Sequence, residues 1–129
     1  MDIGSILSAS TGLEKVMGDV LRVLGLYRRL WLSEIYAEIR GMNSSLNEEL
    51  PKFDDVERAV RELQKLGYVV VEQRTRASLS TMGSVEDLLV TLNQKLEILQ
   101  ALANDKKLQE YNQLRYSSFS RFHKTNKEY

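Results

Sequence analysis

The sequence predicts a mainly α-helical fold that carries one small β-hairpin. The chain has 129 residues, which is enough for one domain with one core. It contains a single proline, Pro51, so long helices are permitted. Apolar residues recur every three or four positions along most of the chain, which is the period of an amphipathic helix. Residues 68–71, Tyr-Val-Val-Val, break that pattern and favour a strand.

The composition is that of an ordinary globular protein, with 43% hydrophobic and 28% charged residues. Eighteen basic residues balance 18 acidic ones, which excludes binding to nucleic acid by bulk charge alone but not a locally basic face. The absence of cysteine excludes disulfides, thiol catalysis and Cys-based metal sites. No apolar run approaches the roughly 20 residues of a membrane span, and the N-terminus lacks the pattern of a signal peptide. We therefore expect a soluble, cytoplasmic protein without membrane contact.

Two helices are predicted in the first part of the chain. The first begins after Thr11, because Thr11 and Glu14 have the spacing of a capping box. Its apolar face comprises Leu13, Val16, Met17, Val20, Leu21 and Leu24. Residues 30–32 form a short apolar stretch that fits either a small strand or a buried connection. Ser33 is the predicted N-cap of the second helix, which ends near Gly41.

A third helix and the hairpin follow a polar connection. The helix covers residues 54–66, with a capping-box spacing at its start. Its apolar stripe comprises Val56, Ala59, Val60, Leu63 and Leu66. Gly67 ends it, since glycine best tolerates the left-handed conformation of a C-cap. The hairpin then consists of a strand at 68–71, a polar turn at 73–76 and a return strand at 77–81.

A long helix is predicted after the hairpin, over residues 84–116. Its apolar positions are Val85, Leu88, Leu89, Leu92, Leu96, Leu99, Leu102 and Ala103. Residues 104–105, Asn-Asp, are a weak point in this helix. Residues 117–129 have few apolar anchors and are predicted to form a mobile tail, and residues 1–10 are predicted to be frayed or loosely docked.

The residues around the end of the third helix carry a family resemblance. Residues 56–70 read V-E-R-A-V-R-E-L-Q-K-L-G-Y-V-V. A helix of this form that runs through Gly-Tyr-Val straight into a strand resembles the winged helix-turn-helix domain, and the resemblance covers about residues 13–82. With a dimerising helix after the wing, the chain is similar to small one-domain regulators of the PadR and MarR-like type. The resemblance implies a winged helix-turn-helix domain at 11–83, DNA reading by helix 54–66 and the wing at 73–76, and dimerisation by helix 84–116.

The candidate DNA contacts are Arg58, Arg61, Lys65, Arg74, Arg76 and Ser33. The three cations of helix 54–66 are spaced by three and four, so they project from one side of the helix. There, guanidinium groups can bind phosphates or guanine edges. The two arginines of the wing share a strand face and can lie along a phosphate backbone or in a minor groove. Ser33 could present backbone N–H groups to a phosphate.

Each candidate contact also has a purely structural interpretation. Glu57 can pair with Arg61, and Glu62 with Arg58, which would make an ordinary solvated helix face. Charges on the wing can protect a strand edge from aggregation. Ser33 can act as no more than a helix cap.

The leucines of the last helix predict self-association. The predicted dimerisation residues are Leu89, Leu92, Leu96, Leu99 and Ala103. Their three-four-three-four spacing is that of a heptad seam in a coiled coil, and a small body cannot cover so long a stripe. We therefore expect a two-fold homodimer. The alternative is that this face packs within its own chain, against the first helix.

These patterns favour a homodimeric DNA-binding protein, a transcriptional regulator that reads double-stranded DNA. We expect no enzyme, because the only histidine is His123 and no glycine-rich phosphate loop is present. No residue is assigned to catalysis, a cofactor or a metal, and no small-molecule effector is specified. Two alternatives stay open. One is a winged-helix module for protein–protein contact in a larger assembly, favoured by the zero net charge, and the other is an architectural protein that binds DNA without sequence preference.

Overall fold

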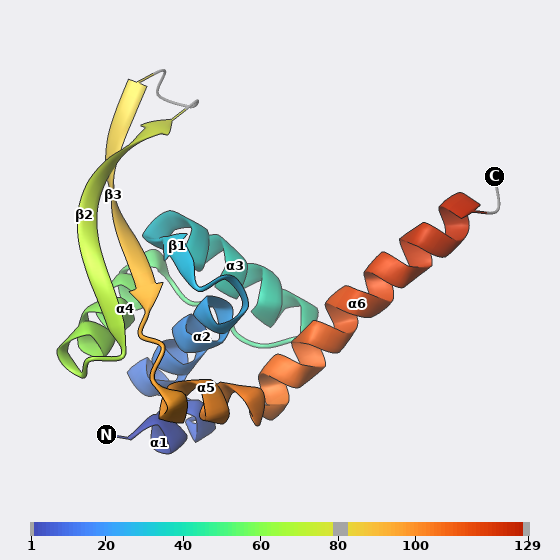
Figure 1. The fold of residues 1–129 in the computed structure, drawn as a ribbon, viewed down its shortest axis with the longest axis horizontal. Coiled ribbons are helices and arrows are strands. Elements are labelled where there is room, and N and C mark those ends of the chain that lie inside the picture. Colours follow the sequence, from blue (N-terminus) through green and yellow to red (C-terminus); the bar gives the residue numbers. More distant parts are fainter. Residues whose placement is uncertain (1, 79–82, 128–129) are drawn as a thin grey trace.

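The computed structural model describes the backbone of residues 2–78 and 83–127, and the side chains of these residues as far as Ser117. The described helices are α1 (Ile3–Ser8), α2 (Gly12–Tyr27), α3 (Leu32–Ser45), α4 (Phe53–Lys65), α5 (Leu96–Ala103) and α6 (Lys106–Lys127). The described strands are β1 (Arg29–Trp31), β2 (Val69–Ser78) and β3 (Gly83–Leu92). The β2–β3 hairpin and α6 extend from the helical body in different directions (Figure 1).

The predicted fold class, mainly α with a small β-hairpin, is confirmed. Strands β1, β2 and β3 form one antiparallel sheet with β3 in the centre. The open question about residues 30–32 is also answered, since Arg29–Trp31 is a strand and Leu30 pairs with Val90 of β3. The order α2, β1, α3, α4 and the hairpin is compatible with a winged-helix topology.

Helix α2 lies at the centre of the core. Residues 17–24 of α2 are all buried, so the helix is covered on every side rather than along one stripe. Its neighbours are α1, α3, α4 and α5. Close approach of α1 is possible because residue 18 is glycine: a Cβ atom there would lie 3.0 Å from the carbonyl oxygen of Ile6. The predicted loose start of the chain is therefore wrong, because Ile6 of α1 is fully buried against α2.

Helix α4 packs on this core by its apolar stripe alone. Its buried residues are Val56, Ala59, Val60 and Leu63, as the spacing predicted. Leu66 is 37% exposed and lies just past the helix. Gly67 has a φ of +81°, which confirms the predicted left-handed end of the helix. The opposite face of α4 is thereby left to solvent.

The predicted return strand and the start of the long helix are wrong. The hairpin pairs ten residues on each side, from Val69 with Leu92 to Ser78 with Gly83. The predicted turn at 73–76 therefore lies within β2, and residues 79–81 of the predicted return strand lie outside the described residues. A run of adjacent apolar residues at 88–90 suits a buried central strand as well as a helix, and periodicity alone does not separate the two.

The predicted seam for self-association is broken by this strand. Leu89 and Leu92 belong to β3 and are buried in their own chain, so they cannot form one helical stripe with the residues of α5. On α5, Ile98 and Leu102 face the core, Leu99 is partly buried, and Ala103 is exposed. Leu96 is 70% exposed.

The predicted weak point at residues 104–105 separates two helices, α5 and α6. Helix α6 extends beyond residue 116 as far as Lys127, and the mobility predicted for residues 117–129 stays a prediction. Neither glycine nor proline occurs between residues 106 and 127, so nothing in this stretch breaks a helix.

We expect Leu63→Ala to lower the free energy of unfolding by about 2–5 kcal/mol, because the deleted side chain is fully buried and would leave a cavity. Urea denaturation measures the loss. The control is Leu66→Ala, beyond the C-terminal end of the same helix, for which the expected loss is less than about 1 kcal/mol. Equal losses for the two variants would contradict the packing of α4 described above.

Candidate nucleic-acid interface

The solvent face of α4 carries the three cations predicted from the sequence. Arg58, Arg61 and Lys65 are all exposed and lie opposite the buried stripe, with Asp54 at the start of the same face. Lys65 is 72% exposed and pairs with Glu62 at 3.2 Å. Exposed pairs of this kind contribute little to stability and are easily exchanged for another anion.

The two arginines of this face are not neutralised by their own helix. Within the described part of the chain, Arg58 and Arg61 form no ion pair, and the alternative pairs with Glu62 and Glu57 do not occur. Their guanidinium groups therefore keep their donors for water or for a ligand. The structure brings three of the six predicted DNA contacts together on one helix face.

Arg74 lies on the hairpin rather than in a turn. Its side chain is 51% exposed, and the guanidinium group pairs with the carboxylate of Glu72 at 2.6 Å. Gln73 likewise donates a hydrogen bond to Glu86 on the opposite strand at 2.7 Å. Both side chains thus bind an acidic residue of the hairpin itself.

Arg76 and Ser33 belong to a cluster of contacts with Asp87 and Trp31. We call these four residues the hairpin brace. Arg76 Nε donates to Asp87 Oδ2 at 2.8 Å, and Ser33 Oγ donates to the same oxygen at 2.6 Å. Arg76 Nη2 donates to Ser33 Oγ at 3.1 Å, and the guanidinium lies 5.9 Å from the centre of the Trp31 ring. The brace joins both strands of the hairpin to the start of α3.

The brace changes the roles that the sequence predicted for two residues. Ser33 is not the N-cap, because α3 begins at Leu32 and the backbone N–H of Trp31 donates to Glu34 Oε1 at 3.0 Å. The hydroxyl of Ser33 and the guanidinium of Arg76 are instead engaged with Asp87. Sequence reasoning missed Asp87, which has the spacing of a helix-capping residue after Ser84.

The carboxyl group of Asp87 is ionised in the folded protein, which strengthens its bonds to Arg76 and Ser33. Partial burial by itself would raise the pKa of this carboxyl, but hydrogen bonds from Ser33, Arg76 and the backbone N–H of Leu88 outweigh it. The pKa of Asp87 therefore lies below its ordinary value, and the carboxylate stays charged opposite Arg76 at neutral pH.

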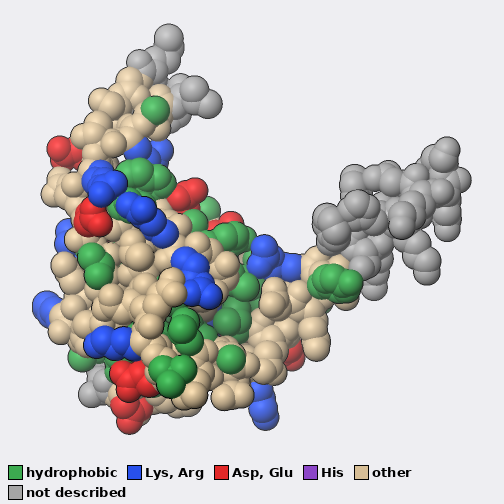
Figure 2. Space-filling model, viewed as in Figure 1, with side chains coloured by type: hydrophobic (Ala, Val, Ile, Leu, Met, Phe, Trp, Pro, Cys, Tyr) green, Lys and Arg blue, Asp and Glu red, His purple; other side chains and the backbone are tan. Residues whose placement is uncertain are grey.

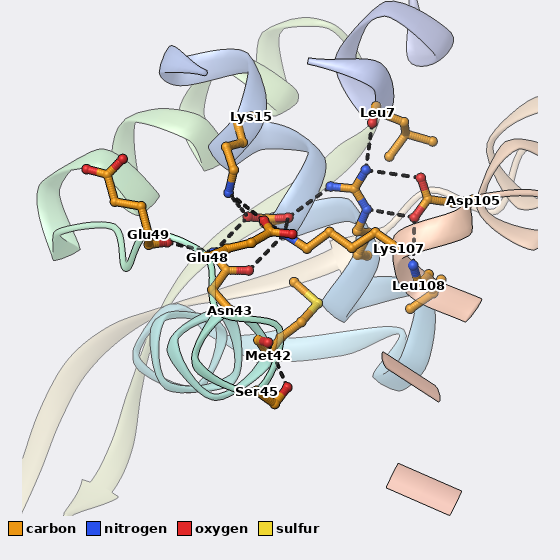
Figure 3. Close-up of polar contacts among 12 residues, drawn as sticks. Leu7, Lys15, Met42, Asn43, Ser45, Glu48, Glu49, Asp105, Lys107 and Leu108 are labelled. Carbon is orange, nitrogen blue, oxygen red and sulfur yellow. Dashed lines mark hydrogen bonds and ion pairs between the residues drawn. The ribbon is translucent and has the colours of Figure 1, made fainter. Parts of the chain in front are cut away.

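A second polar cluster, which we call the junction network, joins α2 to the start of α6. It consists of Lys15, Asp19, Arg22, Asn43, Glu48, Asp105 and Lys107 (Figure 3). No buried side-chain nitrogen or oxygen in the described part of the chain lacks a hydrogen-bond partner. A network satisfied in this way can hold charge inside a small protein.

Asp19 is the centre of the junction network and is only 1% exposed. Its Oδ1 accepts from Arg22 Nη1 at 2.9 Å and from Lys107 Nζ at 2.6 Å. Its Oδ2 accepts from Asn43 Nδ2 at 3.1 Å and from Lys15 Nζ at 3.3 Å. Two helices besides its own, α3 and α6, therefore contribute donors to one carboxylate.

Arg22 holds the other side of the junction. Its guanidinium binds Asp105 with two hydrogen bonds, of 2.7 and 3.0 Å, and also donates to the carbonyl oxygen of Leu7 at 2.6 Å. Asp105 in turn accepts from the backbone N–H of Leu108 at 2.9 Å, in the first turn of α6. One buried arginine thus connects α1, α2 and the break before α6.

Burial and charge pairing oppose each other at Asp19. Burial alone would raise the pKa of this carboxyl, but the charge of Lys107, together with hydrogen bonds from Lys107 and Asn43, outweighs burial and lowers it. The carboxylate is therefore ionised in the folded state. Nothing in the sequence marks it, because Asp19 lies away from the apolar stripe of its helix and is covered only by segments distant in the sequence.

A cavity of about 310 Å³ lies between the junction network and α4. Its walls come from the start of α2, from residues 49–52 and from Asp55 and Arg58 of α4, with Asp19 and Asn43 also lining it. Among the described residues, no group of acidic or histidine side chains is arranged to hold a metal ion.

The charge pattern on the surface is mixed. On the face drawn in Figure 2, Lys and Arg side chains are spread from the hairpin to the helices, and Asp and Glu side chains lie among them. Arg58 and Arg61 on α4 are among the exposed cations of the described residues that form no ion pair, as are Arg28, Arg29 and Lys106 elsewhere on the surface.

Comparison of the chain with protein-family models, curated proteins and solved structures found no match. Of the helices in the described part of the chain, none is both long enough and apolar enough to span a bilayer.

We expect Asp87→Asn to loosen the hairpin, because it removes the charge that holds Arg76 and Ser33. Amide hydrogen exchange in β2 and β3 should become faster while exchange in α2 stays slow. The control is Glu86→Gln, on the exposed side of the same strand, where only a hydrogen bond to Gln73 is altered. Equal exchange in both variants would show that the brace does not hold the hairpin.

We expect the stability of the protein to fall in acid through Asp19. A lowered folded-state pKa stabilises the fold at every pH above the ordinary value of 3.8, and this contribution is lost as the pH falls through the folded-state pKa. In Asp19→Asn, the free energy of unfolding should therefore fall less steeply as the pH is lowered. Urea denaturation from about pH 2 to about pH 7 measures this dependence.

At neutral pH, Asp19→Asn should lower the free energy of unfolding by about 3–5 kcal/mol, because it removes the buried anion that Arg22, Lys15 and Lys107 share. Asp54→Asn, which removes a charge from the exposed face of α4, is the control and should keep the wild-type stability. If the free energy of unfolding of Asp19→Asn fell with decreasing pH as steeply as that of the wild type, the role given to this carboxylate would be contradicted.

Proposed function

We propose that this chain is a winged-helix DNA-binding protein that reads duplex DNA with α4 and acts as a homodimeric transcriptional regulator. The observation that carries the proposal is the exposed face of α4, with Arg58 and Arg61 free of ion pairs among the described residues. The major groove of B-DNA is wide enough to admit one α-helix. Guanidinium groups spaced along such a helix can bind guanine edges or phosphates.

The order of elements supports the same proposal. The helix with the free cations is followed directly by the hairpin, and the hairpin extends beyond the body (Figure 1). The brace at Asp87 sets the direction of the hairpin relative to α3. In this proposal α4 enters the groove, and Arg74 near the middle of β2 lies along the phosphate backbone after exchanging its pair with Glu72 for a phosphate.

Self-association is part of the proposal and involves α6. This helix has 22 residues and projects from the body (Figure 1). Leu114 and Tyr116 on it are 45% and 73% exposed. Pairing of two such helices about a two-fold axis would cover these side chains and would place two copies of α4 on two half-sites.

A protein-binding module is the second candidate, and one observation favours it. The charges of the hairpin are mostly paired within the chain, as in Glu72 with Arg74 and Asp87 with Arg76, so the hairpin offers phosphates little free positive charge. Leu66 and Val70, at the end of α4 and the start of β2, are 37% and 45% exposed and offer an apolar contact to a partner.

We expect Arg58→Ala and Arg61→Ala each to weaken binding to duplex DNA by about tenfold or more, because a good arginine contact to a base discriminates by about 1–3 kcal/mol. A cation lost from a phosphate contact should also reduce the slope of log affinity against log salt by about 1. Fluorescence anisotropy at several salt concentrations measures both quantities.

The control is Lys106→Ala, which removes an exposed cation from α6 and should leave affinity and slope unchanged. Unchanged binding in both arginine variants would refute the assignment of α4. Footprinting separates a regulator, which protects a defined site, from an architectural protein, which does not. The mass in solution tests the dimer.

A further inference from the structure

The start of α6 is bound to the segment that leads into α4. Lys107, in the first turn of α6, donates three hydrogen bonds from its ammonium group: to Asp19 Oδ1 at 2.6 Å, Asn43 Oδ1 at 2.8 Å and Glu48 Oε1 at 2.7 Å. An ammonium group has three N–H donors, so each donor has one acceptor. Lys107 is 13% exposed, so these bonds are largely shielded from water.

The acceptors of Lys107 connect to α4 through a short path. Asn43 Nδ2 donates to the carbonyl oxygen of Glu49 at 3.0 Å, and the backbone N–H of Glu48 donates to the carbonyl oxygen of Asn43 at 2.8 Å. These bonds hold the first part of the connection between α3 and α4. The connection ends at Lys52, whose carbonyl oxygen accepts from the N–H groups of Asp55 and Val56 in the first turn of α4.

In the part of α6 whose side chains the structure describes, up to Ser117, further residues contact the body. Leu108 is buried and Tyr111 partly so. Arg115 lies over the rings of Tyr27 and Tyr111 and donates to the Tyr27 hydroxyl at 3.1 Å. The helix is interrupted between α5 and α6 at residues 104–105, and the polar bonds of Asp105 and Lys107 at this interruption contribute to the direction of α6.

We propose that Lys107 is a positioning residue that couples the direction of α6 to the position of the DNA-reading helix α4. The proposal rests on the function proposed above for α4 and adds the route by which pairing of two α6 helices reaches it. A shift of α6 moves the ammonium group away from Glu48 and Asn43, so the connection that sets the start of α4 loses one of its anchors and keeps the pair of Glu48 with Lys15. Arg58 is unchanged chemically but is presented to the groove in a less defined position.

Lys107→Met tests this coupling, with Lys106→Met as the matched control. Both changes replace a lysine of the first turn of α6 by an apolar side chain of similar length, but Lys106 is exposed. We expect amide hydrogen exchange of residues 46–58 to become about tenfold faster in Lys107→Met, within the range typical of coupled sites, and to stay at the wild-type rate in Lys106→Met.

The hairpin is the internal reference in the same experiment. A purely structural loss would raise exchange in β2 and β3 as much as in residues 46–58, whereas loss of coupling raises it only in the connection and the start of α4. Uniform acceleration, or no difference between the Lys107 and Lys106 variants, would overturn the proposal.

A second variant keeps the test decisive if Lys107→Met does not fold. Lys107→Arg retains the positive charge near Asp19, but a planar guanidinium cannot direct three donors to the same three acceptors. It should fold and show the same local acceleration in residues 46–58. Wild-type exchange in this folded variant would overturn the proposal.

DNA binding provides a separate readout. Lys107→Met should lower the affinity for a duplex with two half-sites by about tenfold while the salt slope stays that of the wild type, since no DNA contact is removed. If the wild type binds no DNA, the proposed function fails, but the exchange experiment still decides the coupling. If Arg58→Ala weakens binding and Lys107→Met changes neither exchange nor affinity, the coupling alone is wrong.

Discussion

A buried carboxylate, that of Asp19, organises the centre of the molecule. Asp19 is 1% exposed in a helix that is covered on all sides. A charge removed from water is tolerated only when counter-charges and hydrogen bonds replace the lost hydration. Those groups come from Arg22 on the same helix, Asn43 on α3 and Lys107 on α6. The neutralisation of this one side chain therefore helps to fix where α6 leaves the body.

Different interactions attach α4, the hairpin and α6 to the helical body. Helix α4 is held by apolar burial of one stripe, which leaves the cations of its other face available. The hairpin is held at its base by pairing of β3 with β1 and by burial of apolar residues of β3, and further along by an ion pair and a hydroxyl at Asp87, Arg76 and Ser33. Helix α6 is directed by the junction network. Apolar packing fixes the position of α4. The ionised groups at the hairpin and at the start of α6 make the directions of these two elements sensitive to charge and pH.

Most of the helices and the buried stripe of α4 were predictable, because spacings of three and four report directly on a helix with one buried face. The strand β3 was not, since residues 85–92 satisfy the helical spacing and a buried central strand equally well. Three of the six predicted DNA contacts lie together on α4, and the other three are on or beside the hairpin. Of these, Ser33 and Arg76 belong to the brace because both bind Asp87. Folding brings the three residues together from α3, β2 and β3.

Local patterns in the chain were sufficient for the fold class, the end of α4 at Gly67 and the positive face opposite its apolar stripe, because each of these follows from local spacing or local backbone preference. The packing of the elements was needed to establish which charges are free and which are used inside the molecule. Asp19 and Lys107 are 88 residues apart, and Ser33 and Asp87 are 54 apart. Pairing over such separations depends on how the elements pack, and no local pattern contains that information.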